Sequence, residues 1–238
     1  MKIDIKNDYI KAKFPNDFDV EKYTDKKIII VGGGPTTNDI NWQNLDYDFI
    51  FSCNQYYLCD KMITDKIDLI TLINRMNFLD EGLQQRLDRD NTFVGIEPHH
   101  SNGIYNTDKF KKFIDKYENK CIFFDTMFQN KSGAAPRLAI LAAMLKPKVI
   151  YMVGIDGQNL NLKTKHSFDK NQIGGRDGWE YKIINDHHVA FSKYIHSMSN
   201  KMDIDIYNLG EGHMDNASTD YSKANYPLTE HIKERLNS

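Results

Sequence analysis

A glycine-rich turn directly follows the first strongly apolar run of the sequence, residues 27–31. Such a turn lets the backbone approach a ligand closely and directs amide groups toward a phosphate or a ribose. Thr37 stands where the dinucleotide-binding fingerprint requires Gly or Ala, and no Gly-Lys-Ser/Thr follows as in a P-loop. The turn therefore predicts either a ligand site or a tight connection from a strand to a helix. Its residues are Gly32, Gly33, Gly34 and Pro35.

Small, amide or acidic residues also follow other apolar runs. An Asn side chain both donates and accepts hydrogen bonds, so it can read a base or a ribose, although Asn also forms turns. A Ser-Gly pair can begin a helix, and an Asp can anchor a loop or bind a ligand. Because the carboxyl ends of parallel strands meet at one edge of a sheet, we expect these residues at that edge, where such folds bind ligands. They are Asn54 and Gln55 after 47–52, Asn74 after 67–73, Ser132 and Gly133 before an Ala-rich stretch, and Asp156 after 149–153.

Two histidine pairs could carry acid–base or metal chemistry. His187 and His188 precede a predicted helix at the end of a polar segment, and an imidazole there is a candidate general base or a structural residue. His99-His100 has Glu97 nearby, but neighbouring residues seldom reach one ion, so we assign this pair to a surface loop. The sequence has no His-Glu-x-x-His or Cys-x-x-Cys motif, and we expect no required metal.

Strand and helix patterns alternate along the chain and define the scaffold for these residues. Runs that are apolar throughout, such as 27–31 and 149–153, are typical of strands buried on both faces of a parallel sheet. The pattern predicts an α/β protein with a Rossmann-like, mostly parallel sheet flanked by helices. Predicted strands cover 27–31, 47–52, 67–73, 92–96, 121–124, 149–153 and 203–207, and predicted helices cover 80–89, 107–118, 133–145 and 189–202.

The predicted domain organisation consists of an N-terminal extension and one domain that contains a lid. Residues 1–25 are polar with scattered aromatic side chains, and we expect an N-terminal extension packed on the surface. Residues 26–238 form a single predicted domain. Within that domain, the polar stretch 157–188 has no clear structural pattern of its own, which is typical of a functional lid.

Composition excludes several classes of protein. The chain has 238 residues, 40% of them hydrophobic, which is enough for a core without metal or disulfide support. A net charge of −2 argues against a dedicated nucleic-acid-binding protein. Three cysteines fit neither a zinc site nor a disulfide framework and indicate a cytoplasmic protein. We expect no signal peptide and no integral membrane segment, because no apolar stretch is long enough.

Several of these motifs occur together in an order known from one enzyme family. The most specific is the block at 49–61, Phe-Ile-Phe-Ser-Cys-Asn-Gln-Tyr-Tyr-Leu-Cys-Asp-Lys. With the turn at 32–36, the Ser-Gly pair at 132–133 and Ile-Tyr-Met-Val-Gly-Ile-Asp at 150–156, it resembles the bacterial sialyltransferases of the Campylobacter lipooligosaccharide type. The resemblance runs from about residue 27 to residue 209. The Gly-x-Gly-Pro turn alone is shared with motility-accessory and pterin-pyrophosphokinase-like proteins.

The resemblance implies a metal-independent, inverting glycosyltransferase built on a single Rossmann-like domain with a lid. Such an enzyme transfers a nonulosonic sugar, such as sialic acid, from a CMP donor to a hydroxyl of a glycan or small-molecule acceptor. It requires no cofactor besides this nucleotide-sugar donor. Related enzymes form homo-oligomers, although no interface can be identified from the periodicity of this sequence.

The resemblance also implies roles for individual residues. Asn54 and Asn74 would contact the nucleotide or its phosphate, and the turn at 32–35 would shape the cytidine site. Ser132 and Gly133 would hold the donor, with Asp156 beside the pocket. His188, or its neighbour His187, would be the general base that takes the proton of the acceptor hydroxyl.

Two departures from the family pattern affect the donor site. The family has Asn in the first turn, where this chain has Gly33, which removes a donor-binding side chain. The family also has two tyrosines that stabilise the departing phosphate, and these positions fall near Gln158 and His166 here. We hypothesise that His166 replaces a tyrosine hydroxyl by donating a hydrogen bond.

Two alternatives use the same scaffold. A pyrophosphokinase-like transferase using ATP and magnesium would need clustered carboxylates, for which Asp60, Asp68 and Asp156 are the candidates near the expected edge. A catalytically inactive protein that only binds a nucleotide sugar is the other alternative, because the phosphate-stabilising tyrosines are missing.

Overall fold

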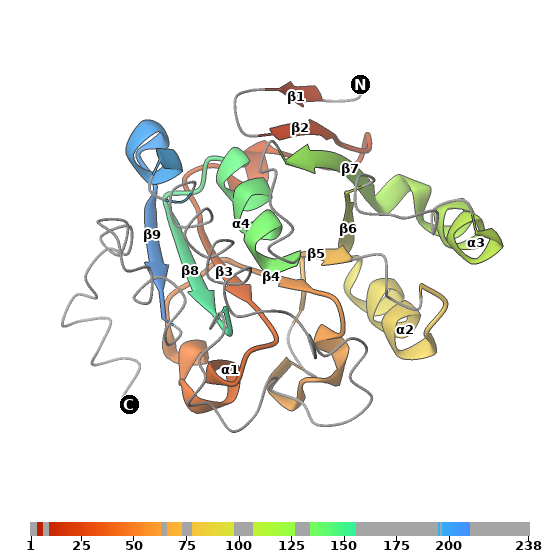
Figure 1. Ribbon diagram of the computed structural model, residues 1–238, viewed down its shortest axis with the longest axis horizontal. Helices are drawn as coiled ribbons and strands as arrows, with labels where there is room; N and C mark the ends of the chain where they lie inside the picture. Colours follow the sequence, from red (N-terminus) through yellow and green to blue (C-terminus); the bar gives the residue numbers. More distant parts are fainter. Residues whose placement is uncertain are drawn as a thin grey trace, which may run out of the picture.

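The protein folds around one nine-stranded sheet within the residues that the computed structural model describes, which are 4–6, 10–62, 66–72, 78–97, 107–126, 134–155, 195 and 197–209. The strand order is β1-β2-β7-β6-β5-β4-β3-β8-β9 (Figure 1). The strands are β1 (Asp4–Lys6), β2 (Ile10–Lys13), β3 (Lys27–Val31), β4 (Phe49–Cys53), β5 (Leu69–Leu72), β6 (Phe93–Ile96), β7 (Cys121–Thr126), β8 (Val149–Val153) and β9 (Asp205–Asn208).

The strands from β3 to β9 pair in parallel, which confirms the predicted mostly parallel sheet. The two antiparallel pairs are β1 with β2 and β2 with β7, at one edge. From β3 the chain proceeds through β4, β5, β6 and β7 on one side, and β8 and β9 lie on the other side. The strand order therefore changes direction between β3 and β8, and open parallel sheets bind ligands at the carboxyl ends of strands at such a position.

Helices follow the strands, as the alternating pattern predicted. Asp80 caps α2, because its side chain accepts a hydrogen bond from the Leu83 amide, and Thr107 caps α3 in the same way through the Phe110 amide. Residues 197–202 are also helical. The helices are α1 (Thr36–Asp39), α2 (Glu81–Asp90), α3 (Asp108–Tyr117) and α4 (Ala134–Met144), with 3₁₀ turns η1 (Glu21–Tyr23), η2 (Trp42–Asn44), η3 (Tyr56–Leu58), η4 (Asp60–Met62) and η7 (Glu118–Lys120).

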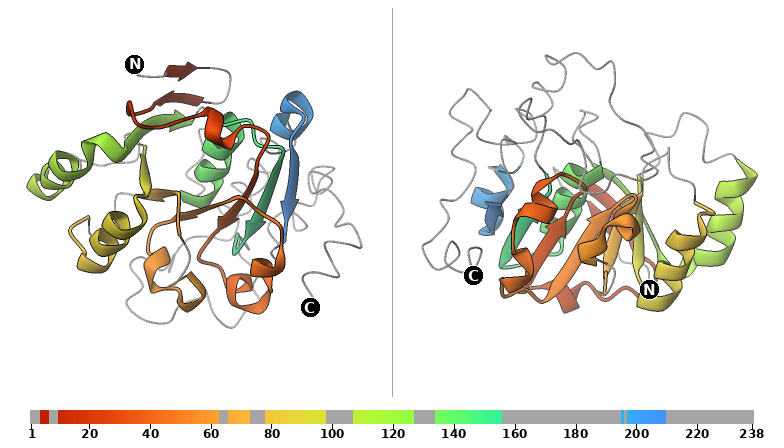
Figure 2. Two further views of the ribbon diagram at one scale, coloured as in Figure 1. Left: turned by 180° about the vertical axis from the view of Figure 1, so that it is seen from behind. Right: turned by 90° about the horizontal axis from the view of Figure 1, so that it is seen from below.

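Two apolar clusters cover the two faces of the sheet, because successive strand residues point to opposite sides. Ile28 and Ile30 pack with α4 on one face, and Ile29 and Val31 belong to the cluster that contains α2 and α3. Ten of the eleven residues of α4 are buried, and all of these except Arg137 are apolar. Figure 2 shows α2 and α3 side by side near β6, where Lys116 of α3 donates hydrogen bonds to α2.

Residues 10–23 differ from the expected surface extension. β2 joins the sheet beside β7, and the side chains of Phe14, Phe18 and Tyr23 belong to the main core. The Phe18 ring stacks on the rings of Phe14 and Tyr23 and contacts Phe93 edge-on. The N-terminal segment is therefore an integral part of the fold. Its apolar residues have neither a helical nor a strand period, so no local pattern indicated their burial.

No helix within the described ranges is long and apolar enough to cross a membrane.

Candidate functional site

The turns after β3 and β8 meet at the carboxyl edge of the sheet. Val31 of β3 pairs with Val153 of β8, so Gly32 and Gly154 follow the two strands next to each other. The amide of Gly32 donates a hydrogen bond to the Val153 carbonyl (2.8 Å), and the amide of Gly34 donates to the Gly154 carbonyl (2.8 Å). These two amides therefore join the two turns, as expected for the tight connection that was one of the two interpretations of this turn. Gly33 and Gly34 are half-buried, and Gly32 and Pro35 are buried.

Two threonine hydroxyls fix the same junction from α1. The Thr37 hydroxyl donates to the Gly32 carbonyl at 2.8 Å, and the Thr36 hydroxyl accepts from the Gly154 amide at 3.1 Å. Both threonines are at most 3% exposed. The short helix that follows the glycine turn thus holds the turn after β8 in place, and the edge between β3 and β8 is rigidly built.

The next strand brings Asn54 to the same edge. Asn54 follows β4 with a φ of 52°, in the left-handed region that Asn tolerates better than most residues. Its amide donates to the Thr71 carbonyl of β5 at 2.9 Å, so its backbone is held between two parallel strands. The residue is half-buried, whereas Gln55 is only 7% exposed. A non-glycine residue in this conformation is a common feature of functional turns.

Thr71 connects this turn to the beginning of α4. Its carbonyl accepts from the Asn54 amide, and its hydroxyl donates to the Ala134 carbonyl at 3.4 Å. Ser132 and Gly133 come immediately before Ala134 in the chain. Thr71 is 3% exposed, so both contacts lie in the interior. Two elements that the sequence predicted to bind one ligand are therefore joined through one buried residue, Thr71, by its carbonyl on one side and its hydroxyl on the other.

Cys53 is the last residue of β4 and directly precedes Asn54. Burial raises the pKa of the Cys53 thiol to about 12, so the thiol is protonated near neutral pH. The neighbouring Ser52 hydroxyl donates to the Val31 carbonyl at 2.6 Å and joins β4 to β3. The protonated Cys53 thiol is therefore a poor nucleophile near neutral pH.

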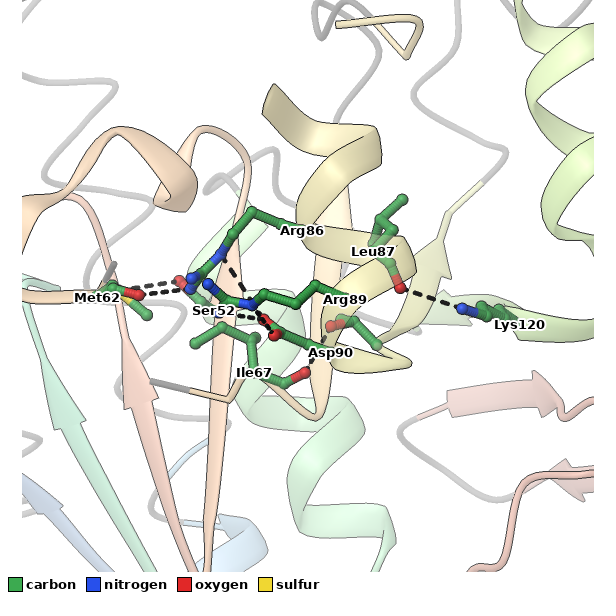
Figure 3. A network of polar contacts seen from close by, with 9 residues as sticks. Ser52, Met62, Ile67, Arg86, Leu87, Arg89, Asp90 and Lys120 are labelled. Carbon is green, nitrogen blue, oxygen red and sulfur yellow. Dashed lines mark hydrogen bonds and ion pairs between the residues drawn. The ribbon is translucent and has the colours of Figure 1, made fainter. Parts of the chain in front are cut away.

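A polar network supports the segment that follows Asn54 (Figure 3). Arg86 of α2 donates a hydrogen bond to the Met62 carbonyl at the end of η4 and lies 3.7 Å from the Asp90 carboxylate. The Arg86 guanidinium also lies over the Tyr56 ring, 5.6 Å from its centroid. Burial raises the pKa of the Tyr56 phenol, so the hydroxyl stays neutral. This network fixes residues 56–62, which the sequence block 49–61 includes, against α2.

A second buried ion pair lies at the carboxyl edge and was not predicted as such. Glu97 follows β6, and its Oε2 lies 2.9 Å from Nε of Arg137 in the first part of α4. Its Oε1 accepts from both the amide and the hydroxyl of Thr126, each at 2.7 Å. Glu97 and Arg137 are each 5% exposed. From the sequence, the His99-His100 pair near Glu97 was assigned to a surface loop, and no partner was predicted for Glu97 itself.

Several predicted site residues fall outside the described part of the chain. They are Asn74, Ser132, Gly133, Asp156, His166, His187 and His188. The proposed lid at 157–188 and the His99-His100 pair, which was assigned to a surface loop, also lie outside it.

Asp68 does not belong to the predicted carboxylate cluster. It precedes β5, at the amino end of the strand, where its carboxylate lies 3.4 Å from Lys22 Nζ. Asp60 lies in η4, which follows β4 and η3 along the chain. Among the residues described, no group of three or more His, Cys, Asp or Glu side chains could hold a metal ion.

The fold and these turns define an α/β protein in which the described candidate residues, the turn at 32–35 and Asn54, follow neighbouring strands at the carboxyl edge of the sheet. The sequence matches no protein-family model and no curated protein, but several solved structures share its fold.

The monofunctional α-2,3-sialyltransferase Cst-I from Campylobacter jejuni is 16% identical, with a TM-score of 0.60 over 91% of this chain and 87% of its own. The sialyltransferase CstII from Campylobacter jejuni, in complex with cytidine-5'-monophosphate, is 17% identical, with a TM-score of 0.55 over 90% and 98% of the two chains. An α-2,3-sialyltransferase from Campylobacter jejuni in apo form is 20% identical, with a TM-score of 0.55 over 92% and 85%. The predicted resemblance is thus confirmed at the level of the fold.

Proposed function

We propose that this protein is a sialyltransferase-like glycosyltransferase that uses a CMP-linked nonulosonic sugar as donor. The observation that carries the proposal is the likeness to a CstII structure bound to cytidine-5'-monophosphate, over 90% of this chain and 98% of that one. The half-buried Asn54, on a fixed left-handed turn at the carboxyl edge, is the described residue best suited to contact the nucleotide.

In the proposed reaction the bond between the anomeric carbon of the sugar and the CMP phosphate breaks, and CMP leaves with the bonding electrons. The acceptor hydroxyl attacks the opposite face of the sugar, which inverts its configuration. A histidine with a pKa near neutral takes the proton of this hydroxyl. We assign this role to His188 or His187, and we assign stabilisation of the leaving phosphate to His166. The acceptor is a glycan or a small molecule, and the reaction requires no metal.

Calorimetric titration of the protein with CMP and with ATP, each with and without magnesium, tests the proposal. We expect CMP to bind without magnesium and more tightly than ATP. Magnesium-dependent preference for ATP would support the pyrophosphokinase-like alternative and overturn the proposal. If CMP binds, release of CMP from CMP-sialic acid separates an enzyme from a protein that only binds the donor.

The contribution of Asn54 can be isolated with a glycine variant. Asn54→Gly removes the side chain but retains the left-handed backbone without strain, because glycine adopts positive φ readily. We expect CMP binding to weaken by roughly tenfold, as for the loss of one well-placed hydrogen-bonding group. Asn91→Gly is the matched control, because Asn91 has a φ of 53° at the end of α2 and precedes β6 at its amino end. An equal loss in both variants would contradict a role for Asn54 in binding.

A further inference from the structure

The Glu97 carboxylate contacts both β7, which precedes residues 127–133, and α4, which follows them. Its Oε1 accepts two hydrogen bonds from Thr126, the last residue of β7, and its Oε2 pairs with Arg137 of α4. Thr126 is the described residue before this segment, and Ala134 is the described residue after it. Glu97 itself follows β6, so the contacts join three elements at the carboxyl edge of the sheet.

Stability alone is a weak reason for this arrangement. Removing two charges from water is costly, and a well-packed apolar pair of similar size is often as stable as a buried ion pair or more so. Burial raises the pKa of the Glu97 carboxyl, while Arg137 and the Thr126 hydrogen bonds oppose this shift. What the carboxylate provides, and an apolar side chain would not, is two directional hydrogen bonds from Thr126 to one oxygen and a charge that holds Nε of Arg137 2.9 Å from the other oxygen. Such directional contacts hold groups in one geometry.

We propose that Glu97 is a positioning residue that fixes the end of β7 and the beginning of α4 relative to each other, and thereby sets the ends of the segment that carries Ser132 and Gly133. This inference rests on the proposed function, in which these two residues hold the nucleotide donor. Arg137 transmits the constraint to α4, and Thr71 provides a second constraint through the Ala134 carbonyl. Glu97 acts through these contacts, and it does not need to touch the donor itself.

CMP affinity measured by calorimetry tests the inference in Glu97→Gln and Thr126→Val. The Gln variant keeps the size of the side chain but loses the charge that pairs with Arg137, and we expect the dissociation constant for CMP to rise by roughly tenfold or more. The Val variant removes only the hydroxyl contact, and we expect a rise of roughly threefold. Both variants should remain folded, as judged by circular dichroism and a cooperative unfolding transition.

Two controls separate positioning from stability. Asp68→Asn neutralises a buried carboxylate at the amino edge of the sheet, and it should leave CMP affinity unchanged. Glu97→Met/Arg137→Met replaces the pair by apolar side chains; it should regain stability relative to Glu97→Met alone but still bind CMP weakly. If CMP affinity in the double variant returned together with stability, the pair would have only a structural role, and the inference would be overturned. Affinity within twofold of wild type in a folded Glu97→Gln protein would overturn it equally.

Hydrogen exchange distinguishes failure of this inference from failure of the proposed function. Peptides covering 121–126 and 134–141 should exchange faster in Glu97→Gln than in Asp68→Asn, whether or not the wild-type protein binds CMP. Lack of CMP binding by wild type would overturn the proposed function while this measurement still tests the constraint. Unchanged exchange in both peptides would show that Glu97 does not fix these elements and would overturn the inference.

Discussion

Gly32 and Gly154 are packed so closely that neither position has room for a side chain. A Cβ atom on Gly32 would lie 2.4 Å from the carbonyl oxygen of Gly154, and one on Gly154 would lie 2.0 Å from the Thr37 hydroxyl oxygen. Gly154 also has a φ of +66°, which L side chains rarely adopt. A glycine is therefore required at position 32 because Gly154, directly after β8, lies against it. This contact fixes the edge of the sheet where we expect the nucleotide.

Replacement of Gly32 by Ala should destabilise the protein strongly. The clash is with backbone atoms of Gly154, which cannot move aside as a flexible side chain can, so we expect a loss of about 3 kcal/mol in unfolding free energy. Gly82→Ala is the control, because its Cβ would meet only side-chain atoms, the nearest at 3.1 Å in Tyr57, and Ala favours the helix. Urea unfolding measures both variants. A loss below that of Gly82→Ala would mean that the two turns can separate easily.

The native thiols should react slowly with a disulfide reagent. Burial raises the pKa values of Cys53 and Cys121 to about 12, and Cys59 is buried. Only the thiolate reacts, so at pH 8 the reaction of Cys53 and Cys121 should be slower than in the unfolded protein by on the order of a thousandfold. Reaction with 5,5'-dithiobis(2-nitrobenzoate), with and without denaturant, measures this. One rapidly reacting thiol in the native protein would contradict the burial of that cysteine.

Asp68 should make the protein less stable as pH rises above about 4. Burial raises the pKa of its carboxyl above the unfolded value of about 4, although Lys22 and Lys66 oppose the shift. The native state therefore binds the proton more tightly than the unfolded chain, and this stabilising contribution is present at low pH and lost as pH rises through the native pKa. Asp68→Asn cannot titrate, so its stability relative to wild type should improve between pH 4 and pH 7 in urea unfolding. A trend in favour of wild type would show that the lysine pairs dominate.

Sequence patterns predicted the central elements closely and the contacts between distant segments poorly. The strands 27–31 and 149–153 were predicted to the residue, because central parallel strands are apolar throughout and end at glycines. The predicted helices 80–89 and 107–118 begin at Asp80 and Thr107, which are the capping residues of α2 and α3 in the structure. In contrast, the burial of Phe14 and Phe18 depends on strands that come much later in the chain, and no local period reveals it.

The same distinction applies to the candidate site. Asn54 was found because polar residues directly after an apolar strand have a visible local signal. The use of the Gly32 amide depends on Val153, and the pairing of Glu97 depends on Arg137, each far away in the sequence. A charged residue near two histidines is typical of a surface loop when only the local sequence is considered, because a buried partner far away in the chain is not visible there. An arginine within an otherwise apolar helix, such as Arg137 in α4, is the signal that could have indicated a buried acidic partner.

Thr71 should affect nucleotide binding through its two contacts at the carboxyl edge. Thr71→Val keeps the shape of the side chain but removes the hydroxyl that donates to the Ala134 carbonyl, and the Asn54 amide retains its backbone partner. We expect a loss of about 1–2 kcal/mol in unfolding free energy, because a buried carbonyl loses its donor. We also expect CMP to bind several-fold more weakly, because the beginning of α4 is no longer tied to the turn that carries Asn54.

Thr92→Val is the matched control for Thr71→Val, because it separates an effect on CMP binding from an effect on global stability. The Thr92 hydroxyl is fully buried and donates to the Ile67 carbonyl at 2.6 Å, so its removal is the same chemical change. However, Thr92 precedes β6 and Ile67 precedes β5, which puts the contact at the amino edge of the sheet. Both variants should therefore lose similar stability in urea unfolding, and only Thr71→Val should weaken CMP binding in calorimetry. Equal weakening in both would mean that binding follows global stability, and that the carboxyl edge has no special part in it.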